Sequence, residues 1–200
     1  MAEITAADVK ALRDQTGAGM MDCKAALTEA DGDPAKALEI IRVKMGNKVG
    51  KLAGRETSEG TVQSYIHANG KVGVLVEVGC NTDFVARNED FVAFAKDVAL
   101  HIAASPATRW IAEDEVPEEA KDAERRVYAQ QLENVPEHAR EKAAEGKLKS
   151  WFAEVVLLDQ PHVNGDKHEG KTIEQLRAEL SAKTGENVVI RRFVRFQVGE

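Results

Sequence analysis

The feature that most constrains the fold of this chain is a pair of alternating segments joined by Asn69-Gly70. Alternate residues of a strand point to the same face of a sheet, so this pattern predicts a strand on each side of the pair. Asn-Gly is a strong signal for a tight turn between such strands, because both residues tolerate a positive φ. The sequence therefore predicts an antiparallel hairpin. The residues that share a face are Val62, Ser64 and Ile66 before the turn and Val72, Val74, Val76 and Val78 after it.

A third alternating segment, Asn187–Val198, follows a helical pattern that ends at Gly185. We expect it to add a third strand and to complete a small antiparallel sheet. Because helical patterns precede and separate the strands, the chain is expected to belong to the α+β class, with helices packed on a short sheet. One face of the third strand is expected to carry Val188, Ile190, Val194, Phe196 and Val198, and the other Arg191 and Arg195.

The first 45 residues carry signals for three short helices. Thr5 and Asp8 form a capping box, in which a hydroxyl and a carboxylate satisfy free amides at a helix start. Thr16–Gly19 ends the first helix, and Asp33-Pro34 supplies an N-cap and a first-turn proline for the third. The sequence therefore predicts an N-terminal three-helix domain over residues 1–45, similar to ubiquitin-associated (UBA) domains.

A stretch with four glycines and several lysines follows the third helix, which we expect to end near Lys44. Its composition predicts a mobile linker over residues 46–60. Residues 61–200 then form the core domain with the sheet. Within it, two helical stretches separated by Asn134–Pro136 predict an antiparallel helical hairpin at about 117–156.

The composition excludes several classes of function. The 200 residues include 34 acidic and 27 basic side chains, for a net charge of −7, whereas binding to a nucleic-acid backbone needs clustered positive charge. No apolar run approaches the roughly 20 residues of a membrane-spanning helix, and the N-terminus lacks the features of a signal peptide. We expect a cytoplasmic protein that binds neither nucleic acid nor membranes.

Metal, nucleotide and thiol chemistry have weak support. Cys23 and Cys80 are far apart in the sequence and are expected to stay reduced. The five histidines lack the spacing of a zinc site, and Thr16–Met20 lacks the residues that complete a phosphate-binding loop. We therefore expect no metal, no cofactor and no direct nucleotide binding. A thiol enzyme built on Cys80 stays open as a rival, although a cysteine that ends an apolar strand is more often a packing residue.

An acid and a large aromatic stand side by side at Asp83-Phe84, where the second strand gives way to a helix. An exposed phenylalanine side chain forfeits about 2 kcal/mol of burial. Phe84 therefore either folds back into its own core or serves as an apolar wedge for a partner, with Asp83 as a polar arm. No catalytic set of residues accompanies the pair, so we expect that the protein is not an enzyme.

Two motifs resemble the translation elongation factor Ts (EF-Ts) family in its short form. The first comprises Leu12-Arg13 and Thr16–Leu27, and the second is the Thr-Asp-Phe loop within Cys80–Ala86. Both occur in the family's order, and His101–Ala104, Gln160-Pro161 and the C-terminal strand are also similar to family segments. The resemblance thus covers nearly the whole chain. Longer members carry a duplicated core and a C-terminal helical module, whereas this sequence has one hairpin and one such loop.

The resemblance implies a guanine nucleotide exchange factor that binds elongation factor Tu, in its GDP-bound and nucleotide-free states, and promotes GDP release. In the family, the Thr-Asp-Phe loop enters the partner's GTPase domain near its magnesium site, and the N-terminal domain docks elsewhere on that domain. His67, next to the hairpin turn, is a candidate for a further contact or for a purely structural role. The expected contact residues are Thr82, Asp83, Phe84 and Val85 in the loop and Leu12, Arg13, Met20 and Met21 in the N-terminal domain.

Short members of the family imply a homodimer, in which a second subunit replaces the duplicated half. An exposed edge of the third strand would provide a route to pairing. The alternative function is that of a non-catalytic helical adaptor, whose N-terminal domain binds an unrelated protein and whose C-terminal part dimerises. Release of labelled GDP from elongation factor Tu separates the exchange factor from this adaptor and from a thiol enzyme.

Overall fold

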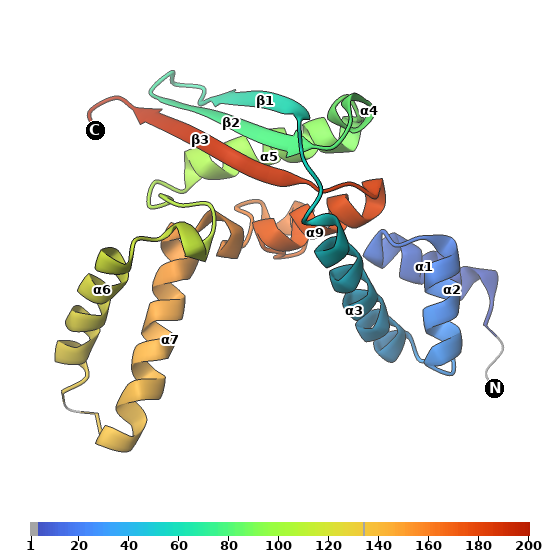
Figure 1. The fold of residues 1–200 in the computed structure, drawn as a ribbon, viewed down its shortest axis with the longest axis horizontal. Coiled ribbons are helices and arrows are strands. Elements are labelled where there is room, and N and C mark those ends of the chain that lie inside the picture. The colour runs from blue at the N-terminus through green and yellow to red at the C-terminus, as the bar shows by residue number, and fades with distance from the viewer. Residues whose placement is uncertain (1–3, 134) are drawn as a thin grey trace. The chain divides into compact units, whose positions relative to one another are not determined.

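The computed structural model describes residues 4–133 and 135–200. It confirms the α+β class, because helices accompany a three-stranded antiparallel sheet with the strand order β1-β2-β3 (Figure 1). The chain divides into two compact units, each built from several segments. The first comprises the residues up to Gln63, Val76–Lys96 and Gln175–Arg191, and the second comprises Ser64–Leu75, Asp97–Glu174 and the residues from Arg192 on.

In the first unit, the three N-terminal helices have a core of their own. They are α1 (Ala6–Thr16), α2 (Met20–Glu29) and α3 (Pro34–Leu52). The predicted capping box begins α1: Asp8 N donates to Thr5 Oγ1 over 3.2 Å, and Thr5 N donates to Asp8 Oδ2 over 2.9 Å. This bundle buries a contiguous apolar cluster of Val9, Leu12, Cys23, Ala26, Leu27, Ala30, Ala37 and Ile41.

The third helix begins as predicted at Asp33-Pro34, but the prediction that it ends near Lys44 was wrong, because it continues to Leu52. The extension crosses two glycines, each of which costs about 1 kcal/mol in a helix relative to alanine. Val49 and Leu52 are buried in these last turns, so packing offsets the weak helix propensity. The division into domains at a linker over 46–60 stays a prediction.

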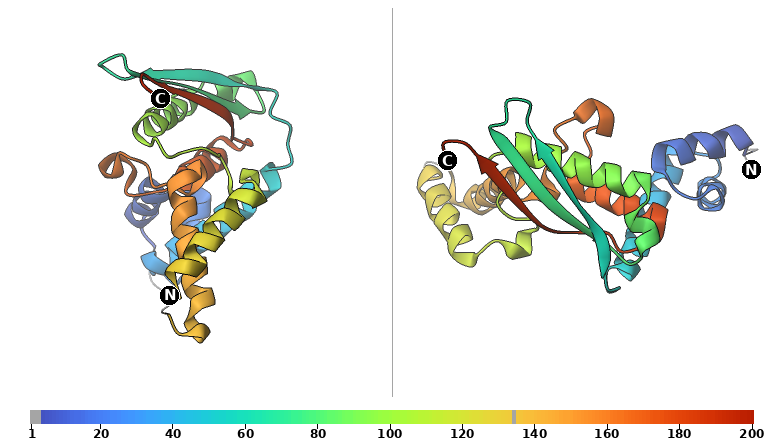
Figure 2. Two further views of the ribbon diagram at one scale, coloured as in Figure 1. Left: turned by 90° about the vertical axis from the view of Figure 1, so that its left-hand side faces the viewer. Right: turned by 90° about the horizontal axis from the view of Figure 1, so that it is seen from above.

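The predicted hairpin is formed by β1 (Glu59–Ile66) and β2 (Val72–Cys80). In the second unit, Gly70 has a φ of 68°, and Lys71 N donates to the Asn69 side-chain oxygen over 3.0 Å. Asn-Gly therefore closes the turn in the way the sequence indicated. Within the first unit, the beginning of α5 (Glu89–Ala104) lies along the sheet (Figure 2). The buried residues here are Val76, Val78 and Cys80 of β2 and Phe91, Phe94 and Ala95 of α5.

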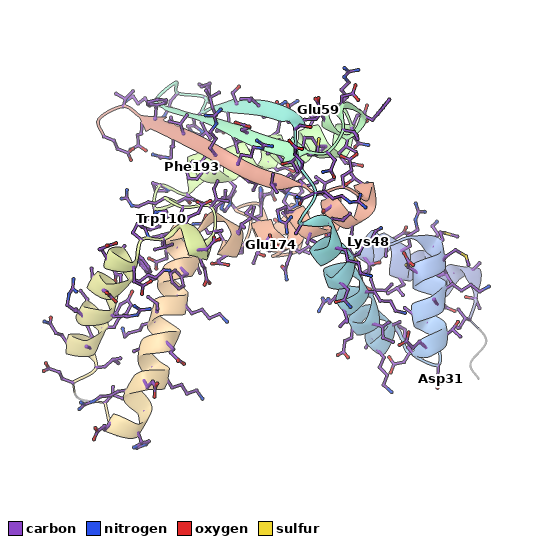
Figure 3. The ribbon with its side chains drawn as sticks, viewed as in Figure 1. Asp31, Lys48, Glu59, Trp110, Glu174 and Phe193 are labelled. Atoms are coloured by element: carbon purple, nitrogen blue, oxygen red, sulfur yellow. The ribbon has the colours of Figure 1, made fainter. Side chains whose placement is uncertain are left out.

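The second unit contains the predicted helical hairpin. Its helices are α6 (Glu118–Gln131) and α7 (Glu137–Val155); of the predicted break at Asn134–Pro136, Asn134 lies outside the described residues. At the base of the hairpin, the ring of Trp110, labelled in Figure 3, meets the Trp151 ring edge-on at a centroid distance of 5.9 Å. The aromatic residues Trp110, Trp151 and Phe152 pack against a buried cluster here. Shorter elements of the unit are the 3-10 turns Glu113–Glu115 and Leu157–Asp159 and the helix α8 (Gly165–His168).

The last two elements are α9 (Ile173–Thr184) and the third strand, β3 (Val189–Gln197). The helix ends at Gly185, which has the left-handed φ of 73°. The strand lies at an edge of the sheet, as expected. The apolar face predicted for this segment is not buried throughout: Ile190 is buried, whereas Val194 and Phe196 of the strand and Val198, just past its end, are exposed.

Candidate partner-binding site

The loop between β2 and α5 exposes Phe84. The short helix α4 (Asp83–Ala86) begins here, and Thr82 caps it by accepting a hydrogen bond from Val85 N over 3.4 Å. None of the four described residues of α4 is buried, and Phe84 is 83% exposed. The ring therefore does not fold back into its own core, and it is available for contact with another molecule.

The cation beside Asp83 is exposed to solvent. Arg87 Nη2 lies 3.3 Å from Asp83 Oδ2, one helical turn away, and the Arg87 side chain is largely exposed. Exposed ion pairs of this kind contribute about 0 to 1 kcal/mol. The carboxylate can therefore leave Arg87 for a group of a partner at little cost.

A carboxylate from a distant part of the chain holds the start of the loop. Glu186, in the turn between α9 and β3, accepts hydrogen bonds from Asn81 N over 2.9 Å and from Thr82 N over 3.1 Å. It also accepts one from the Thr82 hydroxyl over 2.6 Å. Hydrogen bonds to a charged acceptor are roughly twice as strong as neutral ones. Glu186 was not predicted as a site residue, because it lies 104 positions from Thr82 and belongs to no motif.

Cys80, at the end of β2, is a packing residue. Its side chain is fully buried and its thiol donates to the Thr82 carbonyl over 3.2 Å. Burial, together with the nearby Glu186 carboxylate, raises the pKa of the Cys80 thiol to about 11. Because the thiolate is the nucleophilic form, a thiol with this pKa is inert at neutral pH. The packing interpretation is therefore confirmed, and the thiol enzyme loses its support.

The predicted contact residues of the N-terminal helices divide into exposed and buried ones. Met20 and Met21, in the first turn of α2, are 53% and 76% exposed, and Arg13 is exposed at the end of α1. Leu12 is only 3% exposed and belongs to the core of the bundle. Two thioethers and a guanidinium are thus exposed on this bundle, whereas Leu12 packs in its core.

His67 belongs to the second unit, and the other predicted contact residues belong to the first. It is exposed at the hairpin turn, and its Nδ1 lies 3.1 Å from the Tyr65 hydroxyl. Within residues 4–133 and 135–200, no group of three or more histidine, cysteine or acidic side chains is arranged to hold a metal ion. In the same described part of the chain, no helix is long and apolar enough to cross a membrane.

Comparison with known proteins relates the sequence of this chain to translation elongation factors. The sequence model of the family described as "Elongation factor TS" matches residues 7–200. The chain is 48% identical over 202 residues to elongation factor Ts of Trichodesmium erythraeum. The matched region covers 100% of this chain and 91% of that relative. It is 50% identical over 199 residues to that of Acetivibrio thermocellus, with 98% and 91% covered. For Syntrophus aciditrophicus the identity is 49% over 199 residues, with 98% and 97% covered.

These similarities run along nearly the whole chain and are well above the identity at which members of one family are recognised. The chain belongs to the elongation factor Ts family. The resemblance carried by the two sequence motifs is thereby confirmed, and the protein has a role in translation elongation.

Proposed function

We propose that this chain is a guanine nucleotide exchange factor that binds elongation factor Tu·GDP and promotes GDP release, and is not itself an enzyme. The observation that carries the proposal is the exposed Phe84 ring, on a loop that the first unit holds without burying it. Asp83 stands beside it with only a weak internal ion pair. An apolar wedge next to an exchangeable carboxylate suits insertion near a bound cation.

The loop acts on the partner's magnesium site. Phe84 enters between elements of the GTPase domain, where burial of its ring contributes about 2 kcal/mol. Asp83 competes for hydrogen bonds there and repels the phosphates of GDP, so magnesium and phosphate coordination weaken. Thr82 and Val85 contact the partner beside them. The active groups of this chain are thus two side chains that displace ligands, and GDP never binds to the chain directly.

The energetics require a second contact surface. A ten-thousand-fold acceleration of release corresponds to about 5.5 kcal/mol, which exceeds what one buried ring provides. Arg13, Met20 and Met21 supply docking energy on another part of the GTPase domain, and methionine suits such a surface because its side chain adapts to irregular contacts. Leu12 supports these residues from the core below them. His67 stays a proposal for an additional contact.

Thermodynamic linkage constrains the cycle. If this protein weakens GDP binding by a given factor, GDP weakens the binding of this protein by the same factor. The complex with nucleotide-free elongation factor Tu is therefore the tightest one, and added guanine nucleotide dissociates it. As a factor of translation elongation, the chain acts in the cytoplasm.

We also propose that two copies of the chain associate through the sheet. Strand β3 lies at an edge, and Val194 and Phe196 in its last part and Val198 just after it are exposed. An open strand edge with exposed apolar side chains favours pairing with a second chain. Sedimentation of the protein at tens of micromolar tests this proposal, because a strict monomer contradicts it.

Release of labelled GDP from elongation factor Tu tests the exchange function. We expect the protein to accelerate release in proportion to its concentration until it saturates. A matched sample in which excess unlabelled GDP is added without the protein gives the basal rate. Binding to elongation factor Tu without any acceleration would favour the adaptor function, and neither binding nor acceleration would overturn both.

A further inference from the structure

We infer that Glu186 and Asn187 form a joint that positions the Phe84 loop relative to the end of α3, and that Glu186 is a positioning residue for nucleotide exchange. The inference deepens the proposed function and rests on it. Glu186 touches no reacting group. It acts through Asn81 and Thr82, whose backbone amides it binds directly.

Asn187 makes the second half of the joint. Its backbone N–H donates to Asn81 Oδ1 over 2.8 Å, and its side-chain amide donates to the carbonyls of Ala53 and Arg55 over 3.1 and 3.0 Å. Asn81 in turn donates from its side-chain amide to the Glu56 carbonyl. The segment that leaves α3, the start of the Phe84 loop and the turn after α9 are thus bonded to one another through two asparagines.

The turn that carries the joint is itself held in place. The Ser181 hydroxyl donates to the Glu186 carbonyl, and Gly185 takes the left-handed conformation that the turn requires. Lys48 Nζ, on α3, donates to the Ala182 carbonyl over 2.8 Å. The N-terminal helices and the last turns of α9 are therefore connected at a second point. Hydrogen bonds to Ala182 and Glu186 thus hold the turn in place.

Positioning, and not stability alone, is the expected role because of what the loop lacks. Helix α4 has four residues, none of which is buried among those described. Because no residue of α4 is fully buried, we expect the loop to lose its orientation when its polar anchors are removed. Holding each residue in one conformation costs about 1 to 2 kcal/mol of backbone entropy, which the anchors must offset. The core of the first unit lies elsewhere, in β2, α5 and the bundle. Loss of the Glu186 carboxylate should therefore misplace Phe84 and leave the fold intact.

Glu186→Gln tests this inference, because glutamine keeps the size of the side chain but not its charge. Glutamine keeps only one accepting oxygen and loses the negative charge, so it weakens the set of hydrogen bonds that the two carboxylate oxygens accept from Asn81 and Thr82. We expect the maximal rate of stimulated GDP release to fall about tenfold, which corresponds to about 1.4 kcal/mol. The concentration of the protein that gives half the maximal rate should stay within about twofold, and the amides of Asn81 and Thr82 should exchange faster with deuterium.

Two further variants separate positioning from a general structural effect. In a Phe84→Ala background, Glu186→Gln should add little to the kinetic defect, because residues that act through one another are not additive. Lys183→Ala is the matched control: Lys183 lies near the same helix end, and its Nζ pairs with Asp90 Oδ2 on the surface at 2.6 Å. We expect this control to exchange nucleotide at the unsubstituted rate.

The inference is overturned if Glu186→Gln keeps the full maximal rate, or if its defect is unchanged in the Phe84→Ala background. It is also overturned if the loss of rate is matched by a loss of thermal stability, with no change in Thr82 amide exchange. If the unsubstituted protein itself fails to accelerate GDP release, the proposed function falls. The deuterium exchange of Asn81 and Thr82 then decides separately whether Glu186 holds the loop.

Discussion

The two proposed contact regions of the first unit are built in opposite ways. The α1–α3 bundle has its own apolar core, and Met20 and Met21 are exposed at the start of its second helix, α2. The α4 loop has no buried residue among those described, and its anchors are hydrogen bonds to Glu186. One surface is therefore rigid because of its packing, and the other is placed by a few polar contacts.

This difference suggests a division of labour. A surface on a packed bundle has a preformed backbone, so binding there costs no ordering of the chain beyond that of the methionine side chains themselves. A loop held by polar contacts can adjust to the partner as it inserts, at a modest loss of hydrogen bonds. We expect the bundle to determine how tightly the protein binds and the loop to determine how fast GDP leaves. Substitutions in each region should therefore change different parameters.

The largest effect is expected from a substitution in the core of the bundle. Leu27 is almost fully buried there, and Leu→Ala at such sites costs about 2 to 5 kcal/mol. Leu27→Ala should lower the free energy of unfolding by about 3 kcal/mol, as measured by urea denaturation. A loss below about 1 kcal/mol would mean that the bundle is not held by this core.

Phe84→Ala should have almost no effect on stability but a large one on exchange. The ring is 83% exposed, so its removal leaves no cavity. Loss of about 2 kcal/mol of burial in the partner should slow the maximal stimulated release about thirtyfold, as followed with labelled GDP. A melting temperature several degrees lower, with exchange unaffected, would instead assign Phe84 to the core.

Replacing both exposed methionines of the bundle should affect binding more than rate. For Met20→Ala with Met21→Ala, we expect the half-maximal concentration to rise about tenfold, or about 1.4 kcal/mol, with the maximal rate nearly unchanged. Val43→Ala is the matched control, because Val43 is also exposed and apolar on the bundle but lies outside the predicted contact set. An equal effect of Val43→Ala would show that general surface hydrophobicity, and not this pair, is involved.

The second unit contains a buried histidine, His101, whose pKa is shifted by its surroundings. His101 Nδ1 accepts a hydrogen bond from Val163 N over 3.0 Å, and Nε2 lies 2.7 Å from Gln160 Oε1, so the neutral ring donates there. Burial, and to a lesser extent the adjacent His162, lowers the pKa of His101. The ring therefore stays neutral in the fold.

The sign of the pH effect follows from that lowered pKa. Below about pH 6.5 a histidine of the unfolded chain binds a proton that folded His101 does not. Stability should thus decline as the pH falls from about 6.5 toward the lowered pKa of His101, and this group should cause no change in stability above about pH 6.5. Urea denaturation between pH 7.5 and 5.5 measures the decline, and His101→Gln should reduce its slope. An unchanged slope in the variant would assign the decline to other groups.

The regular elements were predictable where local signals agree with packing. The Asn69-Gly70 turn and the Thr5–Asp8 capping box act over a few residues, so sequence alone identified them. The length of α3 was not predictable in this way. Burial of Val49 and Leu52 outweighs the low helix propensity of the two glycines in its second half. Local sequence patterns thus predict where an element begins better than where it ends, because the end depends on packing.

The candidate site was predictable only in part. The motif pointed to Asp83 and Phe84, but no local pattern says whether an aromatic at a corner is buried or exposed. The anchor at Glu186 joins positions 104 apart, and such a long-range hydrogen bond leaves no periodic signal. Leu12 shows the reverse case: it belongs to the family motif, yet it is buried, because a motif can mark packing as well as contact.

The central claim is that the bundle governs binding and the loop governs rate. Stimulated release of labelled GDP from elongation factor Tu, titrated with the unsubstituted protein, the Phe84→Ala variant and the Met20→Ala/Met21→Ala variant, tests it most directly. We predict a lower maximal rate at an unchanged half-maximal concentration for the loop variant, and the opposite pattern for the methionine variant. If both variants change the same parameter to the same extent, the division between the two regions is contradicted.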